Sequence, residues 1–307
     1  MNHRVKAEIR YGEHFTSAGQ ILRSALVSGP GIVWVTTFLL LPLVAIGVIS
    51  FLSKGAYGWF EPPFTLYSYK RFVGFGLLGF DILYPIIILR SFVLGAATAF
   101  LCAAAAFPLA FFICGLKPRY KNVALTLVVI PLWTNLMIRT YAWQIILGPQ
   151  SWLSHLAAAL GLVPTGAGLF PSTLAVYIGM VCDFLPFLVL PLYASAEKLD
   201  WSIVEAAQDL GANAFNTFRH GILPQVMPGL AAGFILVLIP ATGQFVIPDL
   251  LGGGKTVLLG NLIQQQFLQS RDWPFGAAIA FLTMGLSMAG LWLYVRLTAC
   301  KGEETLL

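Results

Sequence analysis

Six long apolar runs alternate with polar segments along the chain, at roughly 31–53, 86–115, 121–148, 171–195, 226–247 and 275–297. A helix needs about 20 residues to cross the ~30 Å hydrocarbon core of a bilayer. Each run is long enough, and the prolines inside several of them are tolerated where neighbouring helices satisfy the freed backbone groups. The pattern predicts an all-α polytopic membrane protein with six transmembrane helices.

The polar segment between the fourth and fifth runs predicts a short helix. Ser202 followed three residues later by Glu205 is a capping-box pattern, which marks a helix start. Gly211 predicts its end, because glycine readily takes the left-handed conformation that often follows a helix. The apolar positions of this helix recur at helical spacing and share one face: Ile203, Ala206, Ala207 and Leu210.

A second short helix is predicted directly after the first. Asn213 can cap its start, and Pro224 closes the unit. Phe215, Phe218 and Ile222 again fall on one face. The segment is therefore expected to form a helix–turn–helix at the membrane surface, with apolar side chains offered to a soluble partner.

Composition supports a membrane protein. The 307 residues are 58% hydrophobic and 10% charged, with a mean hydropathy of +0.82, whereas soluble domains carry about 25% charged residues. Residues 1–30 are polar and the first apolar run is too long for a cleaved signal peptide. The net charge of +5 is spread over short loops, which indicates signals for membrane orientation rather than binding to nucleic acid.

The distribution of Lys and Arg predicts the orientation, because cytoplasmic loops carry the excess. One side carries eleven of these residues: Arg4, Lys6, Arg10, Arg23, Lys117, Arg119, Lys121, Lys198, Arg219, Arg296 and Lys301. The other carries five: Lys54, Lys70, Arg71, Lys255 and Arg271. Both termini and the polar segment 202–224 are therefore expected in the cytoplasm.

The sequence gives little support for chemistry on this chain. The four cysteines and four histidines have neither metal-ligand nor catalytic spacing. Residues 252–256 read Gly-Gly-Gly-Lys-Thr, but a phosphate-binding loop needs a further glycine at the position that Asp249 holds, and it should follow a strand. We expect no catalytic residue, metal or cofactor here, and ATP must be handled by another chain.

The polar segment also resembles a known motif. Glu205, Ala206 and Ala207, then Gly211, then Leu223 and Pro224, are similar to the EAA loop of bacterial ABC-importer permeases. In that family the loop is the coupling helix, which docks in a cleft on the ATP-hydrolysing subunit. The match departs at Gly221, where an isoleucine is usual. The alternative is an ordinary cytoplasmic loop in which Glu205 only caps a helix.

Further motifs resemble the spermidine/putrescine branch of these permeases. They are Phe245–Gly253, Arg271–Gly276, and Pro131–Asn135 with Ile138–Tyr141. The resemblance covers about residues 30–298. It implies a polyamine-like cation as substrate, carried by alternating access. Two alternatives stay open: an importer of the same class for another small organic solute (an opine, an amino-acid-like or another charged compound), or a secondary transporter.

The resemblance also implies the type I importer fold and the partners of such a system. These are a second permease subunit, two ATP-hydrolysing subunits that bind ATP and Mg, and a periplasmic substrate-binding protein. The chain is then expected in the bacterial inner membrane, surrounded by lipid. Its expected parts are a cytoplasmic segment 1–30, a first helix and periplasmic loop 31–85, a permease core 86–298 with coupling loop 196–225, and a cytoplasmic tail 299–307.

Charged and polar residues within the spans are candidates for the substrate pathway. Charged groups are costly in a bilayer, so Asp183 in run four and Arg139 in run three are expected to be functional or paired. Asp183 either pairs with Arg139 or a neighbouring subunit, or meets a substrate ammonium. Further pathway candidates are Thr242 and Gln244 after Pro240, with packing between helices as the alternative, and Trp133 and Asn135 in the matching motif.

Three carboxylates in the outer loops are candidates for contact with the binding protein: Glu61, Asp249 and Asp272. Each could equally be a solvated charge. Asp272 could also cap the sixth span, which begins close to Pro274.

Overall fold

The structure is a computed structural model, which describes residues 18–55, 58–76, 79–80, 82–161, 164, 166–254 and 257–303. The first 17 residues of the predicted N-terminal segment, the last four of the tail, and Lys255 and Thr256 lie outside the described residues.

The described part is built mainly from helices. The α-helices are α1 (Ala18–Ser50), α2 (Tyr67–Phe72), α3 (Leu83–Cys114), α4 (Pro118–Trp133), α5 (Leu136–Ile146), α6 (Trp152–Ala159), α7 (Thr173–Ala196), α8 (Trp201–Asp209), α9 (Ala214–Asn216), α10 (Leu223–Gly243), α11 (Val246–Gly252), α12 (Leu259–Leu268) and α13 (Trp273–Glu303). A π-helical segment, η2 (Thr217–Ile222), joins α9 to α10. Two antiparallel hairpins pair β1 (Ser53–Lys54) with β2 (Phe60–Glu61) and β3 (Phe75–Gly76) with β4 (Gly79–Phe80).

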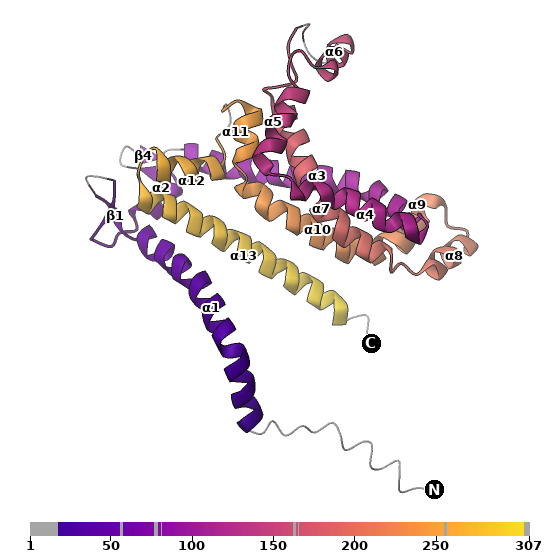
Figure 1. The fold of residues 1–307 in the computed structure, drawn as a ribbon, viewed down its shortest axis with the longest axis horizontal. Coiled ribbons are helices and arrows are strands. Elements are labelled where there is room, and N and C mark those ends of the chain that lie inside the picture. The colour runs from indigo at the N-terminus through magenta and orange to yellow at the C-terminus, as the bar shows by residue number, and fades with distance from the viewer. Residues whose placement is uncertain are drawn as a thin grey trace.

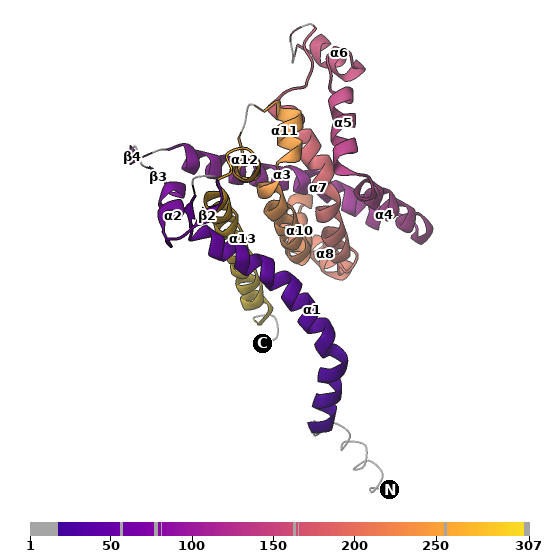
Figure 2. The same cartoon turned by 60° about the vertical axis from the view of Figure 1, so that its left-hand side comes forward.

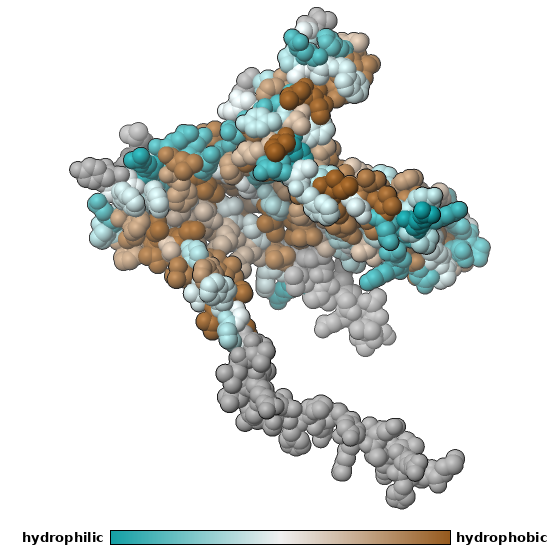
Figure 3. All heavy atoms as spheres, viewed as in Figure 1, coloured by the Kyte–Doolittle hydropathy of each residue, from teal (hydrophilic) through white to brown (hydrophobic). Residues whose placement is uncertain are grey.

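The core is a bundle in which α7 packs against α3 and α10 (Figure 1). Its buried residues come mainly from these three helices and include Cys102, Met180, Leu188 and Val237. The long helix α1 lies outside this bundle and contacts α13. Hydrophobic residues dominate the middle of the molecule, while hydrophilic ones gather at the ends that carry α2 and α8 (Figure 3).

Among the described residues, five helices are long and apolar enough to cross a membrane, and a bent helix pair could make a sixth span. The pair is α4 and α5, whose axes meet at 97°. The prediction of one continuous span over 121–148 is therefore wrong in detail. Figure 2 shows α5 and α6 standing away from the bundle, next to α11.

Local hydrogen bonding explains this break in the third span. The Thr134 hydroxyl donates to the carbonyl of Pro131 at 2.7 Å, and the Asn135 side chain accepts from the amide of Met137 at 2.8 Å. Both residues have extended backbone, so α4 ends and α5 begins with its own cap. Side chains of this kind compete with the helical ladder.

The predicted second short helix is also corrected, because it is continuous with the fifth span. Helical structure runs from Ala214 to Gly243, and Pro224 lies in the first turn of α10 instead of closing the unit. A proline inside a helix clashes with the carbonyl four residues before it. The wider turn of η2 precedes Pro224 and accommodates its ring without breaking the helix.

Candidate functional sites

The helix α8 is capped by Asp200, two residues earlier than the capping-box pattern predicts. The Asp200 carboxylate accepts a hydrogen bond from the Ser202 amide at 2.9 Å. Hydrogen bonds from the side chain and the backbone of Ser202 lower the pKa of Asp200. Ser202 therefore lies inside the helix, and the capping role given to Glu205 is wrong. Glu205 is exposed and makes no ion pair with any described residue.

The end of α8 confirms the prediction for Gly211, which has φ +80°. The Gly211 amide donates to the carbonyl of Gln208 at 2.8 Å, and the Ala212 amide donates to the carbonyl of Ala207 at 3.0 Å. These two bonds form a Schellman motif, in which a residue with positive φ closes the helix. Asn213 caps the next helix as predicted, because its side chain accepts from the amide of Asn216.

The apolar face of α8 has no partner within the described part of the chain. Ile203 is 47% exposed and Leu210 is 89% exposed, and Ala206 is exposed beside them. Val204 is the buried residue of this helix, and it packs against the backbone of Gly221. The stripe predicted from the sequence is therefore open to a partner, and Gly221, the departure from the motif, lies in the contact between α8 and η2.

Side-chain hydrogen bonds attach α8 firmly to the bundle. Gln225 of α10 accepts from the Asp200 amide at 2.9 Å and donates to the carbonyl of Gly221 at 2.8 Å. An ion pair of 3.3 Å between Lys121 and Glu197 joins the start of α4 to the end of α7. Hydrogen bonding to Tyr193, together with Lys121, lowers the pKa of Glu197. Gln225 thus links the start of α8 directly to α10.

The last two residues of the predicted coupling motif belong to another part of the molecule. Leu223 is half-buried and packs on the core, and Pro224 is exposed in the first turn of α10. They lie at the base of the fifth span and not on α8.

Asp183 and Arg139 form an ion pair. Asp183 is 8% exposed in the middle of α7. Arg139, on α5, also donates to the carbonyl of Pro131 and lies 3.5 Å from the Thr134 hydroxyl. Of the two hypotheses for Asp183, pairing with Arg139 is therefore the one that the structure shows. Arg139 supplies a cation at the C-terminus of α4, where the carbonyls lack helical partners.

The other pathway candidates lie at two breaks in the helices. Trp133 is exposed and Asn135 caps α5, on either side of the break in the third span. Gln244 follows the end of α10 and accepts from the amides of Phe245 and Val246, at the start of α11. Thr242 is buried and bonds its own helix, so it packs between α10 and α3 as the alternative predicts.

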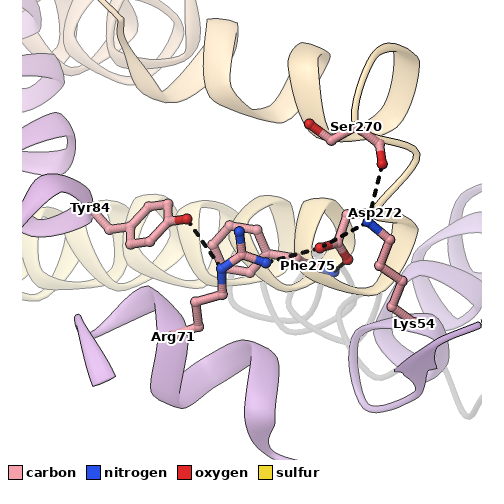
Figure 4. A network of polar contacts seen from close by, with 6 residues as sticks. All are labelled: Lys54, Arg71, Tyr84, Ser270, Asp272 and Phe275. Carbon is pink, nitrogen blue, oxygen red and sulfur yellow. Dashed lines mark hydrogen bonds and ion pairs between the residues drawn. The ribbon is translucent and has the colours of Figure 1, made fainter. Parts of the chain in front are cut away.

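The three outer carboxylates differ in their surroundings. Glu61 and Asp249 are exposed. Asp272 is only 6% exposed and accepts from the amide of Phe275 at 3.3 Å, which confirms that it caps α13. Its carboxylate also pairs with Arg71 at 2.9 Å (Figure 4). Because Asp272 is buried and paired, a direct contact between its carboxylate and a binding protein is not supported.

Arg71 is a residue that the sequence analysis did not single out. Its guanidinium also donates to the Tyr84 hydroxyl at 3.1 Å and lies 4.1 Å from the centre of the Phe275 ring. Burial opposes its charge, yet Tyr84 and Asp272 raise the pKa of Arg71 above its ordinary value. An arginine in an outer loop, against the usual charge bias, was the available signal. No group of His, Cys, Asp and Glu within the described ranges could hold a metal ion.

The chain matches a known family and several curated relatives. Residues 106–299 match the family model described as "Binding-protein-dependent transport system inner membrane component". The chain is 37% identical over 263 residues to the spermidine/putrescine transport system permease protein PotB of Haemophilus influenzae, covering 86% of this chain and 90% of that protein. It is 38% identical over 273 residues to PotB of Escherichia coli K12, covering 88% and 97%.

Solved structures show the same fold. A bacterial ABC transporter involved in the import of the acidic polysaccharide alginate aligns with a TM-score of 0.66 at 14% identity, covering 91% of this chain and 95% of that one. The alginate transporter in complex with its pentasaccharide-bound periplasmic protein aligns with a TM-score of 0.58 at 15% identity, covering 89% and 92%. At these identities the likeness concerns the fold alone.

Proposed function

The chain belongs to the family of binding-protein-dependent transport system inner membrane components, and we propose that it is the permease subunit of an importer for a polyamine-like organic cation. Its curated relatives are transport permeases and its fold is that of the membrane subunits of ABC importers. It is accordingly a multi-pass membrane protein. The substrate is proposed from the spermidine/putrescine relatives.

The exposed apolar face of α8 carries the proposal that this helix docks on an ATP-hydrolysing subunit. A face with Ile203, Ala206 and Leu210 open to solvent needs a partner, because exposed apolar patches usually mark interaction sites. Glu205 lies on the same helix with its carboxylate unpaired within the described residues. We place ATP and Mg on that subunit and none on this chain.

The importer then has the partners and orientation that the sequence predicts. We propose that α8 and both termini lie in the cytoplasm, that a second permease completes the pathway, and that two ATP-hydrolysing subunits drive it. The family description supports a periplasmic substrate-binding protein as a further partner. ATP-driven approach of the two hydrolysing subunits would displace α8, and its attachment to α10 would reorient the spans.

The two helix breaks are our candidates for the substrate pathway. Irregular backbone at membrane depth is tolerated only where protein covers it or where it lines a water-filled cavity. The breaks occur at Thr134–Asn135, beside Trp133, and at Gln244. Since Arg139 neutralises Asp183, we place selection of the cation mainly in the binding protein.

Binding-protein-stimulated ATPase activity of the reconstituted complex tests this function. We expect Glu205→Ala to reduce stimulation by spermidine- or putrescine-loaded binding protein, and Gly211→Asp to abolish it or prevent assembly. Gly161→Asp is a matched control, because Gly161 also has positive φ, +73° against +80° for Gly211, and neither glycine has an atom within 4 Å of an added Cβ.

The outcomes test the class of transporter and the identity of its substrate separately. If both α8 variants keep full stimulation, the coupling role of α8 is wrong. If binding protein loaded with another small organic solute stimulates the wild type, and binding protein with spermidine or putrescine does not, the importer class stands and that other solute is carried. A secondary transporter would purify without an ATPase subunit.

A further inference from the structure

Cations gather at one outer corner of the molecule, against the usual distribution of charge. Lys and Arg normally favour the cytoplasmic side of a membrane protein. Yet of the five that the orientation above places outside, four lie in the corner formed by β1, α2 and the start of α13. We call Lys54, Lys70, Arg71 and Arg271 the basic corner. Orientation signals do not explain a positive cluster on this side, so it needs another cause.

Internal contacts hold the corner together (Figure 4). The Asp272 carboxylate lies 2.9 Å from Arg71 and 3.8 Å from Lys54. Lys54 also donates to the carbonyl of Ser270 at 3.2 Å. These bonds join the first outer loop to the segment before α13, more than 200 residues apart in sequence. Two members of the basic corner, Lys54 and Arg71, are thus fixed by the same carboxylate.

The acids of this corner do not balance its cations. Asp272 is buried beneath Arg71, and Glu61 is folded against Gly55. Among the described residues of this corner, four cations and two carboxylates leave two positive charges in excess. Lys70 and Arg271 are exposed, and neither has an ion pair within the described residues.

Aromatic rings and a polar cavity lie beside the cations. Trp59 is 61% exposed and stacks on Trp273 with ring centres 5.4 Å apart. A cavity of about 540 Å³ is lined by Lys54, Arg71 and Asp272, by several hydroxyl side chains and one amide, and by two apolar side chains. Exposed tryptophan and arginine around a polar recess is the composition of a protein interface.

We propose that the basic corner is the surface on which the periplasmic substrate-binding protein docks, through acidic side chains on that protein's edge. The inference rests on the proposed function and reverses the charge expected from the sequence, where carboxylates of this chain were the candidates. Complementary charge of this kind steers encounter and fixes orientation more than it adds affinity. Of the three carboxylates predicted to meet a partner, Asp272 is already paired with Arg71 inside the chain.

A surface for anionic lipid is the rival explanation. Attraction of basic segments to anionic lipid is described mainly for the cytoplasmic leaflet, whereas this corner lies at the other end of the spans. The recess is also lined by hydroxyl groups and one amide side chain from β1, α2, α12 and the loops beside them, which suits an inserted side chain. These observations favour a protein partner.

The test compares the double variant Lys70→Glu/Arg271→Asn with wild type in nanodiscs. Both residues are exposed, and asparagine tolerates the positive φ of 47° at Arg271. We expect the concentration of binding protein that gives half-maximal ATPase stimulation to rise roughly tenfold, with a weaker dependence on salt between about 0.05 and 0.3 M. Lys117→Glu/Arg119→Asn makes the same charge change at exposed cations at the opposite end of the molecule, and should leave that concentration unchanged.

Each outcome decides the question. If wild type is stimulated and the double variant behaves identically, the docking surface is wrong while the proposed function stands. If removal of anionic phosphatidylglycerol changes the activity of wild type but not of the double variant, and both have the same affinity for the binding protein, the corner binds lipid. If wild type is not stimulated at all, the proposed function fails and this inference fails with it.

Discussion

The ion pair between Arg139 of α5 and Asp183 of α7 offers the sharpest test of how the third span is held. Both side chains are largely withdrawn from solvent. Arg139 also donates to the carbonyl of Pro131 near the end of α4, which accepts from the Thr134 hydroxyl as well. Replacing Asp183 by Asn removes the balancing charge and keeps the volume of the side chain.

The contacts of the two residues predict that the two single substitutions lower the free energy of unfolding by different amounts. Removing one partner of a buried pair costs about 3–5 kcal/mol, because the other charge stays buried. Asp183→Asn leaves Arg139 its contacts with Pro131 and Thr134, so we expect the lower end of that range. Arg139→Gln leaves the Asp183 carboxylate, which is only 8% exposed, without its cation, so we expect the upper end of that range. The double variant buries no charge. Its loss of unfolding free energy should therefore be smaller than the sum of the two single losses by about 1–3 kcal/mol.

Equilibrium unfolding of the solubilised complex in mixed detergent micelles measures these free energies. Uptake into vesicles, normalised to folded protein, should be the same in each single variant as in wild type. If Asp183→Asn abolishes uptake at unchanged stability, the pair is not structural and Asp183 meets the substrate. Additive effects of the two substitutions would equally refute the coupling.

Two further predictions follow from single contacts. Gly229→Ala should destabilise the contact between α7 and α10, because the new Cβ would lie 2.4 Å from the backbone carbonyl of Pro191. Gly243→Ala is the control, because no atom lies within 4 Å of its Cβ position. Thermal unfolding should show a lower midpoint for Gly229→Ala only. The pKa of Asp200 is lowered in the folded protein. Its cap therefore stabilises α8 fully at pH values above the unfolded pKa of about 3.9, and this stabilisation is lost as the pH falls through the folded pKa. Hydrogen exchange at the Ser202 amide should therefore rise in strong acid in wild type but not in Asp200→Asn.

The apolar runs could predict the spans because length and hydropathy alone decide whether a helix can cross a bilayer. The break at Thr134–Asn135 was not predicted, although Pro131 and the two polar side chains that end α4 and begin α5 are typical of a helix end. Hydropathy averaged over a window ignores whether a polar residue bonds its own backbone. Pro224 was predicted to end a helix, and it does not. The π-helical turn before it accommodates the proline ring, so the helix continues.

The candidate sites were predictable to different depths. Gly211 and the apolar face of α8 follow from local geometry, which the sequence carries directly. The partners of Asp183 and Asp272 could not be chosen from sequence alone, because Arg139 and Arg71 reach them across 44 and 201 positions. Burial then decides whether a carboxylate is available to a ligand or already satisfied.

Continuous contacts connect α8 to both helix breaks. Val204 packs on Gly221 at the base of the fifth span, and α10 runs from there to its end before Gln244. The next helix, α11, is tied to α5 because the Gln144 amide donates to the carbonyl of Leu250 at 2.8 Å. Coupling requires an element with two discrete arrangements, and not merely a route of contacts. The two breaks are where the backbone leaves the helical ladder, so they are where the spans can change angle with the smallest loss of hydrogen bonds. A movement imposed at α8 should therefore appear first as a change of angle at Gln244, and only then at Thr134–Asn135.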